Sequence, residues 1–244
     1  MTYQYIKVNK SDFRMDVILA RPEKRNAFTP TMVNELADAF REANDDNAIK
    51  VVMLKAEGPV FCAGMDLKVF ENEDLDVRNP RIEDKNISLG EVFEQLHKPS
   101  IAIVEGNVIA GGFLMIAGCT YVFASKTVQF RLPELELGIF PFQVLASLLK
   151  VMPEKKVLQL CLNTDYFTAQ EATAYGLVDG FLEDADIDGL LEKFKSISAS
   201  AVSAGIRAMR QLPSVNIEER YSFLLKCLHD LKTSADVQKQ LFKK

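Results

Sequence analysis

One stretch, residues 101–120 (IAIVEGNVIAGGFLMIAGCT), constrains the fold more than any other part of the chain. It opens on residues 101–104, an apolar and β-branched run that is typical of a buried strand. Turn-forming residues 105–107 break that run. The glycine-containing residues 110–112 then lead into residues 113–117, which are apolar and contain no proline. The pattern predicts a strand, a glycine turn and a buried helix.

Such a turn has a chemical consequence. Glycine lets another group approach the backbone closely. The first N–H groups of a helix lack intrahelical acceptors, and the helix dipole favours negative charge there, so the turn can hold an oxyanion. A second turn of this kind, residues 61–67 (FCAGMDL), follows an apolar run. On these residues alone, the alternative that the glycines only allow tight helix packing stays open.

Composition narrows the classes of protein. The chain has 244 residues, of which 48% are hydrophobic and 26% charged, which suits one domain or one domain with a helical appendage. Its net charge of -5 gives no general electrostatic footprint for nucleic acid or an anionic membrane. No apolar run approaches membrane-spanning length, and the start lacks a signal-peptide core. The expected setting is therefore reducing and cytoplasmic.

The four cysteines and two histidines have no metal-ligand spacing, so no metal site is expected.

Periodicity predicts strands and helices before about residue 150 and helices alone after it. Polar residues 71–88 are the best candidate for a mobile loop or lid. The expected strands are residues 3–8, 15–20, 50–55, 121–124 and 128–130; the expected helices begin at Pro30 after the capping residue Thr29, and cover residues 89–96, 144–151, 153–162, 169–175, 187–209 and 217–242.

Four motifs follow one another along the chain. They are residues 21–27 (RPEKRNA), residues 61–67, residues 107–113 with Pro133-Glu134, and residues 168–172 with 175–179. In this order they resemble the enoyl-CoA hydratase/isomerase (crotonase) superfamily. The resemblance implies an α/β spiral of ββα units, ClpP/crotonase-like, over residues 1–185 and a C-terminal helical trimerisation region over residues 186–244. It also implies an acyl-CoA or acyl-carrier-protein thioester as ligand, no cofactor beyond the CoA thioester substrate, and a homotrimer or dimer of trimers.

Site residues follow from the same resemblance. By position, the oxyanion hole is formed by the backbone N–H groups of Met65 and Gly111, and Glu134 is the catalytic carboxylate. Lys24 and Arg25 are candidate contacts for CoA phosphates, since cations suit phosphate, although a purely solvated role fits each equally well. Asp66 reads as a turn or cap residue beside the oxyanion turn. The remaining substrate-binding positions are Ala63, Gly64, Leu67, Leu114, Pro133 and Phe142.

The family's hydratases use two glutamates, and this chain keeps one. Leu114 occupies the first position and Glu134 the second. A leucine cannot position or activate water, whereas a single carboxylate beside an oxyanion hole suits a proton shuttle. The motifs around both positions are similar to those of mitochondrial-type Δ3,Δ2-enoyl-CoA isomerases. They imply conversion of 3-enoyl-CoA to 2-enoyl-CoA, with weak or absent hydratase activity.

Several alternatives stay open. Glu136 would share a face with Glu134 in an extended segment, so Glu136 or Glu105 could assist. Apolar neighbours such as Phe140 would raise the pKa of the Glu134 carboxyl if they line the pocket. His229 is expected to pack rather than catalyse. Other functions within the resemblance are a hydratase-like enzyme, a polyketide-branching decarboxylase, a non-catalytic acyl-CoA or acyl-carrier binder, and an RNA-binding relative.

Overall fold

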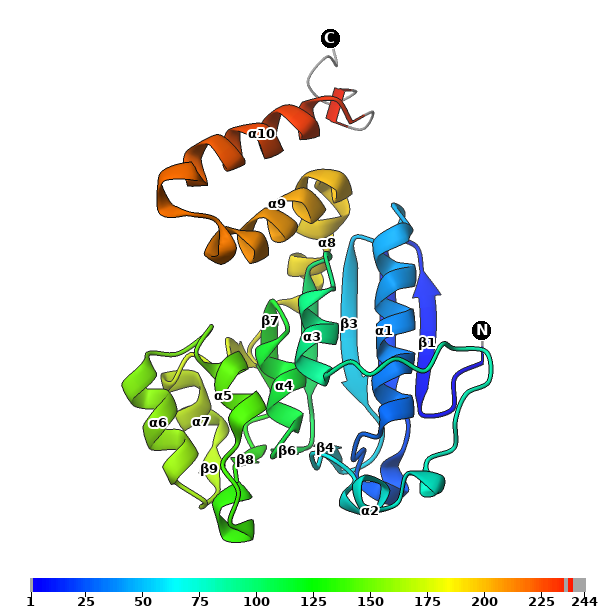
Figure 1. The fold of residues 1–244 in the computed structure, drawn as a ribbon, viewed down its shortest axis with the longest axis vertical. Helices are drawn as coiled ribbons and strands as arrows, with labels where there is room; N and C mark the ends of the chain where they lie inside the picture. The colour runs from blue at the N-terminus through cyan, green and yellow to red at the C-terminus, as the bar shows by residue number, and fades with distance from the viewer. Residues whose placement is uncertain (1, 235–236, 239–244) are drawn as a thin grey trace.

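The computed structural model describes residues 2–234 and 237–238, and its elements repeat in the order strand, strand, helix (Figure 1). The α/β spiral of ββα units expected from the sequence is confirmed. The units are β1 (Ile6–Ser11), β2 (Arg14–Leu19) and α1 (Pro30–Asp45); β3 (Val51–Ala56), β4 (Val60–Cys62), α2 (Leu67–Glu71) and α3 (Leu89–Glu94); β5 (Ser100–Val104), β6 (Asn107–Ile109) and α4 (Gly112–Ala117); and β7 (Tyr121–Ala124), β8 (Gln129–Arg131), the 3-10 turn η3 (Glu134–Leu137) and α5 (Phe142–Leu148).

The strands form two sheets. The larger has the order β1-β2-β3-β5-β7-β10, and the smaller has the order β4-β6-β8-β9, where β9 is Phe167–Thr168 and β10 is Gly180–Phe181. From the second unit onward, the first strand of each unit joins the larger sheet and the second joins the smaller one. Strands β4, β6 and β8 are parallel neighbours. Their carboxyl ends therefore lie along one edge, where ligand sites form in parallel sheets.

Helix α1 begins as its sequence predicts. The Thr29 hydroxyl accepts the Met32 N–H at 3.2 Å, and Pro30 occupies the first helical position. The apolar face of α1 is buried against the core, where Phe40 meets the Phe93 ring edge-on at 5.1 Å between centroids. This packing holds α1 along the larger sheet (Figure 1).

Strand β3 is covered on both faces, which explains its continuous apolar run. Val52 and Leu54 point into the main core. The alternate residues Val51 and Met53 pack instead with Phe194 of α8 (Ile187–Ser196). The period of two along the strand therefore assigns one face to the core and the other to the first C-terminal helix.

The C-terminal expectations need three corrections. Residues 187–209 are not one helix, because Ile197 is extended and the Ser198 side chain caps a new helix, α9 (Ala199–Gln211), by accepting the Ala201 N–H. The expectation of helices alone after residue 150 is wrong as well, since β9 and β10 complete the two sheets. The intervening helices α6 (Glu154–Leu162) and α7 (Ala169–Ala174) form close to the expected bounds.

The last expected helix is shorter than residues 217–242. Helix α10 (Arg220–Lys232) follows a 3-10 turn, Ile217–Glu219, and ends where the Thr233 hydroxyl bonds to the Asp230 carbonyl. The rest of that expectation falls partly on residues 235–236 and 239–244, outside the described part of the chain. Of the described helices, none has the length and apolar character needed to cross a membrane.

Residues 71–88, expected as a mobile loop or lid, are bonded to α1 and to residues just before β1 at several points. The Asn34 amide donates to the Lys85 carbonyl, and the Lys85 N–H donates back to the Asn34 Oδ1 atom at 3.1 Å. The Thr31 N–H donates to Asp76 at 2.8 Å, and the Val77 N–H donates to the Tyr5 hydroxyl at 3.1 Å. These bonds fix the path of the segment in this structure, and its movement stays a prediction.

Candidate active site

Three predicted site segments follow three neighbouring parallel strands. Met65 follows β4, Gly111 follows β6, and Glu134 follows β8. The strand register pairs Ile109 with Arg131, and the Ala110 N–H donates to the Arg131 carbonyl at 2.9 Å. The smaller sheet thus brings together segments that lie about 70 residues apart in the chain.

The two glycine turns touch one another. Gly64 has φ +89°, and a Cβ atom placed on it would lie 2.8 Å from the Ala110 Cβ and 3.2 Å from the Gly111 nitrogen. A Cβ atom placed on Gly111 would lie 2.7 Å from Cε1 of the Phe28 ring. Side chains larger than hydrogen would therefore force the turns apart, which agrees with a close-approach role for both glycines.

Hydrogen bonds to Phe28 orient the first turn. The Phe28 N–H donates to the Gly64 carbonyl at 2.8 Å, and the Asp66 N–H donates to the Phe28 carbonyl at 2.9 Å. The Met65 N–H lies between these bonds, and it has no acceptor within residues 2–234 and 237–238. The Gly111 N–H, at the start of α4, likewise has no acceptor in that part of the chain. Two free donors on touching turns can stabilise one oxyanion.

The Glu134 carboxyl is buried and incompletely bonded. The residue is 9% exposed, and its Oε2 atom has no hydrogen-bond partner among the described residues. Burial raises the pKa of this carboxyl above its ordinary value. A carboxyl with a raised pKa both accepts and returns a proton more readily near neutral pH, as a general acid–base requires.

Burial of Glu134 leads to a prediction about stability. A carboxyl whose pKa is raised in the folded state contributes stability that is fully present below its unfolded pKa, near 4.5, and is lost as pH rises through the folded value. Glutamine stays neutral, so Glu134→Gln should be as stable as the wild-type chain in acid and more stable at neutral pH. Urea unfolding across this range measures the difference. Equal stability of the two chains at neutral pH would mean that the carboxyl is solvated.

The other carboxylates considered for catalysis lie elsewhere. Residues 134–137 form a 3-10 turn, not an extended segment, so Glu134 and Glu136 do not share a face. Glu136 instead pairs with Arg131 at 2.6 Å, and Glu105 is exposed. The expectation of a shared face is therefore wrong, and Glu134 is the buried carboxyl of this turn.

Sequence reasoning missed Arg131. Its Nε–H donates to the Thr164 carbonyl at 2.7 Å, and its guanidinium lies over the Tyr166 ring at 5.1 Å. Together with the Glu136 ion pair, these contacts fix the turn that carries Glu134. The available signal was an arginine directly before a Leu-Pro-Glu segment. Residue spacing does not reveal the contacts of this arginine, because the fold sets them.

Leu114 lies on α4, all of whose residues are buried. It is 2% exposed, and a Cβ atom placed on Gly90 of α3 would lie 3.7 Å from its Cδ2 atom. Pro133 precedes η3 as its cap residue. Phe142, by contrast, begins α5 with 73% of its surface exposed, although its ring contacts that of Phe140. A substrate contact by Phe142 stays a prediction, because it does not line the cavity beside Met65.

That cavity has a volume of about 570 Å³ and lies between α1, α2 and residues 84–89. Its walls include Met65 and Asp66 but not Gly111 or Glu134, so it reaches the oxyanion turns from one side. Apolar and charged side chains both line it; they are Phe28, Val33, Val69, Phe70, Ile87 and Leu89, and Glu73, Asp76, Arg78, Asp84 and Lys85.

The predicted CoA loop is joined to the first oxyanion turn. The Ala63 N–H donates to the Arg25 carbonyl at 3.0 Å, and Arg25 has φ +53°. Lys24 and Arg25 are exposed, so a phosphate contact by either stays a prediction. Asp66 caps α2 by accepting the Lys68 N–H and pairs with Arg21 at 2.7 Å, in agreement with its expected turn role. Leu67, the first residue of α2, is exposed.

His229 is exposed on α10, beyond the end of the larger sheet (Figure 1). The expected packing of His229 therefore stays a prediction. The separation of α10 from β4, β6 and β8 also removes His229 from the edge that carries Glu134.

Comparisons with known proteins find similar sequences. A sequence model of the enoyl-CoA hydratase/isomerase family matches residues 15–243. The chain is 29% identical over 214 residues to the human mitochondrial enoyl-CoA hydratase domain-containing protein 3, covering 81% of this chain and 67% of that protein. It is 29% identical over 200 residues to the probable peroxisomal enoyl-CoA hydratase 1 of Arabidopsis thaliana, covering 81% and 72% of the two chains.

Solved structures extend the match to the whole fold. The enoyl-CoA hydratase from Mycobacterium tuberculosis H37Rv superposes with a TM-score of 0.83 at 27% identity, covering 97% of this chain and 94% of that one. The mitochondrial and peroxisomal names among the relatives leave the cytoplasmic setting a prediction.

Proposed function

Because this chain belongs to the enoyl-CoA hydratase/isomerase family, we propose that it moves the double bond of a 3-enoyl-CoA thioester to the 2-position. The observation that carries the proposal is the buried Glu134 carboxyl, whose Oε2 atom has no hydrogen-bond partner among the described residues. The resemblance of its motif puts Leu114, an alkyl side chain, where the family's hydratases have their other glutamate. Two free N–H donors, on Met65 and Gly111, supply the oxyanion hole.

The reaction uses these three groups in sequence. The thioester oxygen accepts hydrogen bonds from the Met65 and Gly111 N–H groups. Glu134 removes a proton from C2, and the electron pair of the broken C–H bond spreads into a dienolate whose charge lies largely on the thioester oxygen. The dienolate then takes the proton back at C4, so that the double bond lies between C2 and C3 and Glu134 is again ionised. One carboxyl serves as base and then as acid.

Leu114 supports isomerisation over hydration. Addition of water to a 2-enoyl thioester needs a group that orients and deprotonates the water. The Leu114 side chain is 2% exposed, so it offers a water molecule neither a hydrogen-bond acceptor nor space beside it. The relatives named above carry hydratase names. The preference of this chain for 3-enoyl-CoA or for 2-enoyl-CoA therefore distinguishes isomerisation from hydration.

A paired assay tests the proposal. Purified protein is given a 3-enoyl-CoA in one cuvette and a 2-enoyl-CoA in the other, and absorbance of the conjugated thioester is followed in both. The proposal expects absorbance to rise in the first and to stay constant in the second. Rapid loss of absorbance in the second cuvette would assign a hydratase instead. No change of absorbance in either cuvette, together with thioester binding, would assign a binder or a specialised decarboxylase.

Leu114→Glu should add hydration of 2-enoyl-CoA to the chain's activities, because it restores a second carboxylate on α4. The same change puts a charge in a buried position, so we expect the free energy of unfolding to fall by roughly 2–5 kcal/mol. Leu114→Gln is the matched control: it has a similar shape and no carboxylate, and it should gain no hydration. The absorbance assay with 2-enoyl-CoA and urea unfolding measure the two effects.

If the wild-type chain hydrated 2-enoyl-CoA as fast as Leu114→Glu, the role given to Leu114 would be wrong. An unchanged rate in a folded Leu114→Glu chain would mean that the α4 position does not face the thioester. Circular dichroism of both variants establishes that they fold.

The assembly proposed from the family is a homotrimer or a dimer of trimers. Exposed apolar side chains on α10, among them Tyr221, Leu225 and Leu228, are available for such a contact. Sedimentation equilibrium distinguishes these assemblies from a monomer.

A further inference from the structure

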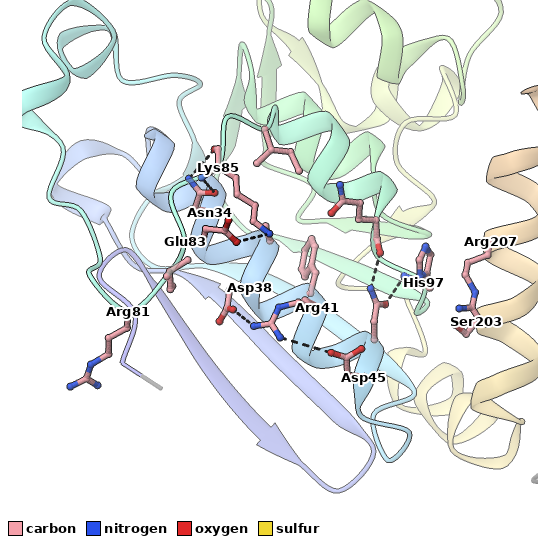
Figure 2. A pocket seen from close by; sticks show the side chains of 16 residues that line it. Asn34, Asp38, Arg41, Asp45, Arg81, Glu83, Lys85, His97, Ser203 and Arg207 are labelled. Atoms are coloured by element: carbon pink, nitrogen blue, oxygen red, sulfur yellow. Dashed lines mark hydrogen bonds and ion pairs between the residues drawn. The ribbon is translucent and has the colours of Figure 1, made fainter.

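A second cavity of about 620 Å³ lies away from the oxyanion turns, between α1, residues 81–87, the end of α3 and α9 (Figure 2). It shares only Lys85 and Ile87 with the cavity beside Met65. Its floor is partly apolar, from Ala37, Phe40 and Ile87. The cavity is thus large enough for a small organic molecule, and the proposed isomerase does not use it.

The charges that line this cavity do not balance. Arg41 pairs with both Asp38 and Asp45, and Lys85 pairs with Glu83 at 3.1 Å. Arg41 is therefore shared by two carboxylates, of which Asp38 also accepts the Tyr3 hydroxyl. The side chains of Arg207 and Arg81 have no carboxylate partner within the described residues. Counting all its charged side chains, the wall has four cations (Arg41, Arg81, Lys85 and Arg207) and three carboxylates (Asp38, Asp45 and Glu83), a net charge of +1.

The unpaired donors gather at the α9 end. Ser203 and Arg207 are four residues apart, one turn of α9, and both face the His97 ring in Figure 2. Arg81 points away from this group. Neither the Ser203 hydroxyl nor the His97 ring has a hydrogen-bond partner within residues 2–234 and 237–238. A hydroxyl, a guanidinium and an imidazole that converge are the donor set that binds an oxyanion.

Hydrogen bonds hold the backbone around His97 in place. The His97 N–H donates to the Asn44 Oδ1 atom at 2.7 Å, and the Asn44 amide donates to the Gln95 carbonyl at 2.7 Å. Arg210 of α9 donates to the carbonyls of Glu94 and Leu96. These bonds fix the distance between α3 and α9, so the donor set exists before any ligand arrives.

We propose that Ser203, Arg207 and His97 bind the phosphate group of a small organic phosphate whose apolar body covers Phe40 and Ala37. The planar guanidinium pairs with two phosphate oxygens, and the hydroxyl and imidazole donate to the third. A bound phosphate joins α9 to α1 and α3, and its apolar body lies against Ile87, which also lines the cavity beside Met65.

Binding should depend on the protonation of His97. Burial, together with the charges of Arg207 and Arg210, lowers the pKa of His97 below its ordinary value. The other charged groups around it are engaged: Lys98 donates to the Asp46 carbonyl, Glu94 bonds to Lys150, and Asp45 bonds to Arg41. A dianion beside the ring favours imidazolium, so bound phosphate and bound proton stabilise one another.

Calorimetric titration with phenyl phosphate tests the proposal. The expected result is saturable binding, tighter than that of inorganic phosphate, with no binding of phenol and weaker binding of benzoate. Arg207→Gln should weaken binding at least about tenfold, equivalent to about 1.4 kcal/mol. Lys193→Gln removes an exposed charge from α8, outside the cavity, and should leave binding unchanged. Nuclear magnetic resonance of the His97 ring should report the same titration.

Three results would overturn the proposal. They are no binding of phenyl phosphate, binding that is unaffected by Arg207→Gln, and binding that is lost in Lys24→Gln and retained in Arg207→Gln. The last would place the phosphate at the loop of the proposed CoA site. Since none of these readouts depends on catalysis, the second site can fail while the proposed isomerase stands, and the reverse also holds.

Discussion

Glu134→Gln is expected to lower kcat for 3-enoyl-CoA by about 10³-fold and to leave the dissociation constant of the thioester almost unchanged. Glutamine keeps the shape of the buried side chain but can neither accept the C2 proton nor deliver one to C4. Positioned acid–base groups typically contribute 10²–10⁴-fold, and this site places both transfers on one group. Initial rates measure kcat, and calorimetric titration with a saturated acyl-CoA measures binding.

Glu136→Gln is the matched control for that variant. It removes a carboxylate from the same 3-10 turn, but one that is exposed and pairs with Arg131. We expect its rate to fall by less than about tenfold, because only the support of the turn is lost. If Glu136→Gln abolished turnover while Glu134→Gln retained it, the assignment of the base would be wrong.

The second large effect is expected from Gly64→Ala, which should reduce kcat by roughly 10²–10³-fold. The new Cβ would lie 2.8 Å from the Ala110 Cβ and 3.2 Å from the Gly111 nitrogen, so the two turns must separate. Their N–H donors would then no longer converge on one oxygen, and loss of one oxyanion donor typically has an effect of this size. Initial rates at saturating 3-enoyl-CoA measure it.

Gly176→Ala separates this effect from backbone strain. Gly176 also has a left-handed φ, +79°, but a Cβ placed there would only meet the Val151 carbonyl at an ordinary 3.5 Å. Both variants should lose about 1 kcal/mol of stability from the left-handed conformation, and only Gly64→Ala should lose activity. Equal loss of activity in the two would indicate a general effect of instability.

Local chemistry was enough to predict the elements that carry the site. The hydroxyl of Thr29 before Pro30 specifies where α1 begins, and the structure confirms it. The glycines at positions 64 and 111 predict close backbone approach, and the turns that contain them touch. In both cases one residue type satisfies a requirement of its own backbone, so no knowledge of distant residues is needed.

Features that depend on tertiary pairing were not predictable in this way. Strand β10 contains two residues and exists because β7 offers it an edge. The break at Ile197 interrupts an apolar periodicity that continues across it, so pattern alone favoured one helix. At the site, the position of the Glu136 carboxylate depends on a 3-10 turn and on its ion pair with Arg131. The assumption of an extended segment placed this carboxylate on the wrong face.

The central claim is that one carboxyl carries the proton from C2 to C4. Conversion of a 3-enoyl-CoA labelled with deuterium at C2, followed by nuclear magnetic resonance of the product, tests it most directly. The account predicts deuterium at C4 of the 2-enoyl product, in an amount that exceeds solvent exchange, and no such transfer in Glu134→Gln. A product with hydroxyl at C3, or one whose C4 hydrogen comes entirely from solvent, would contradict a single-carboxyl shuttle.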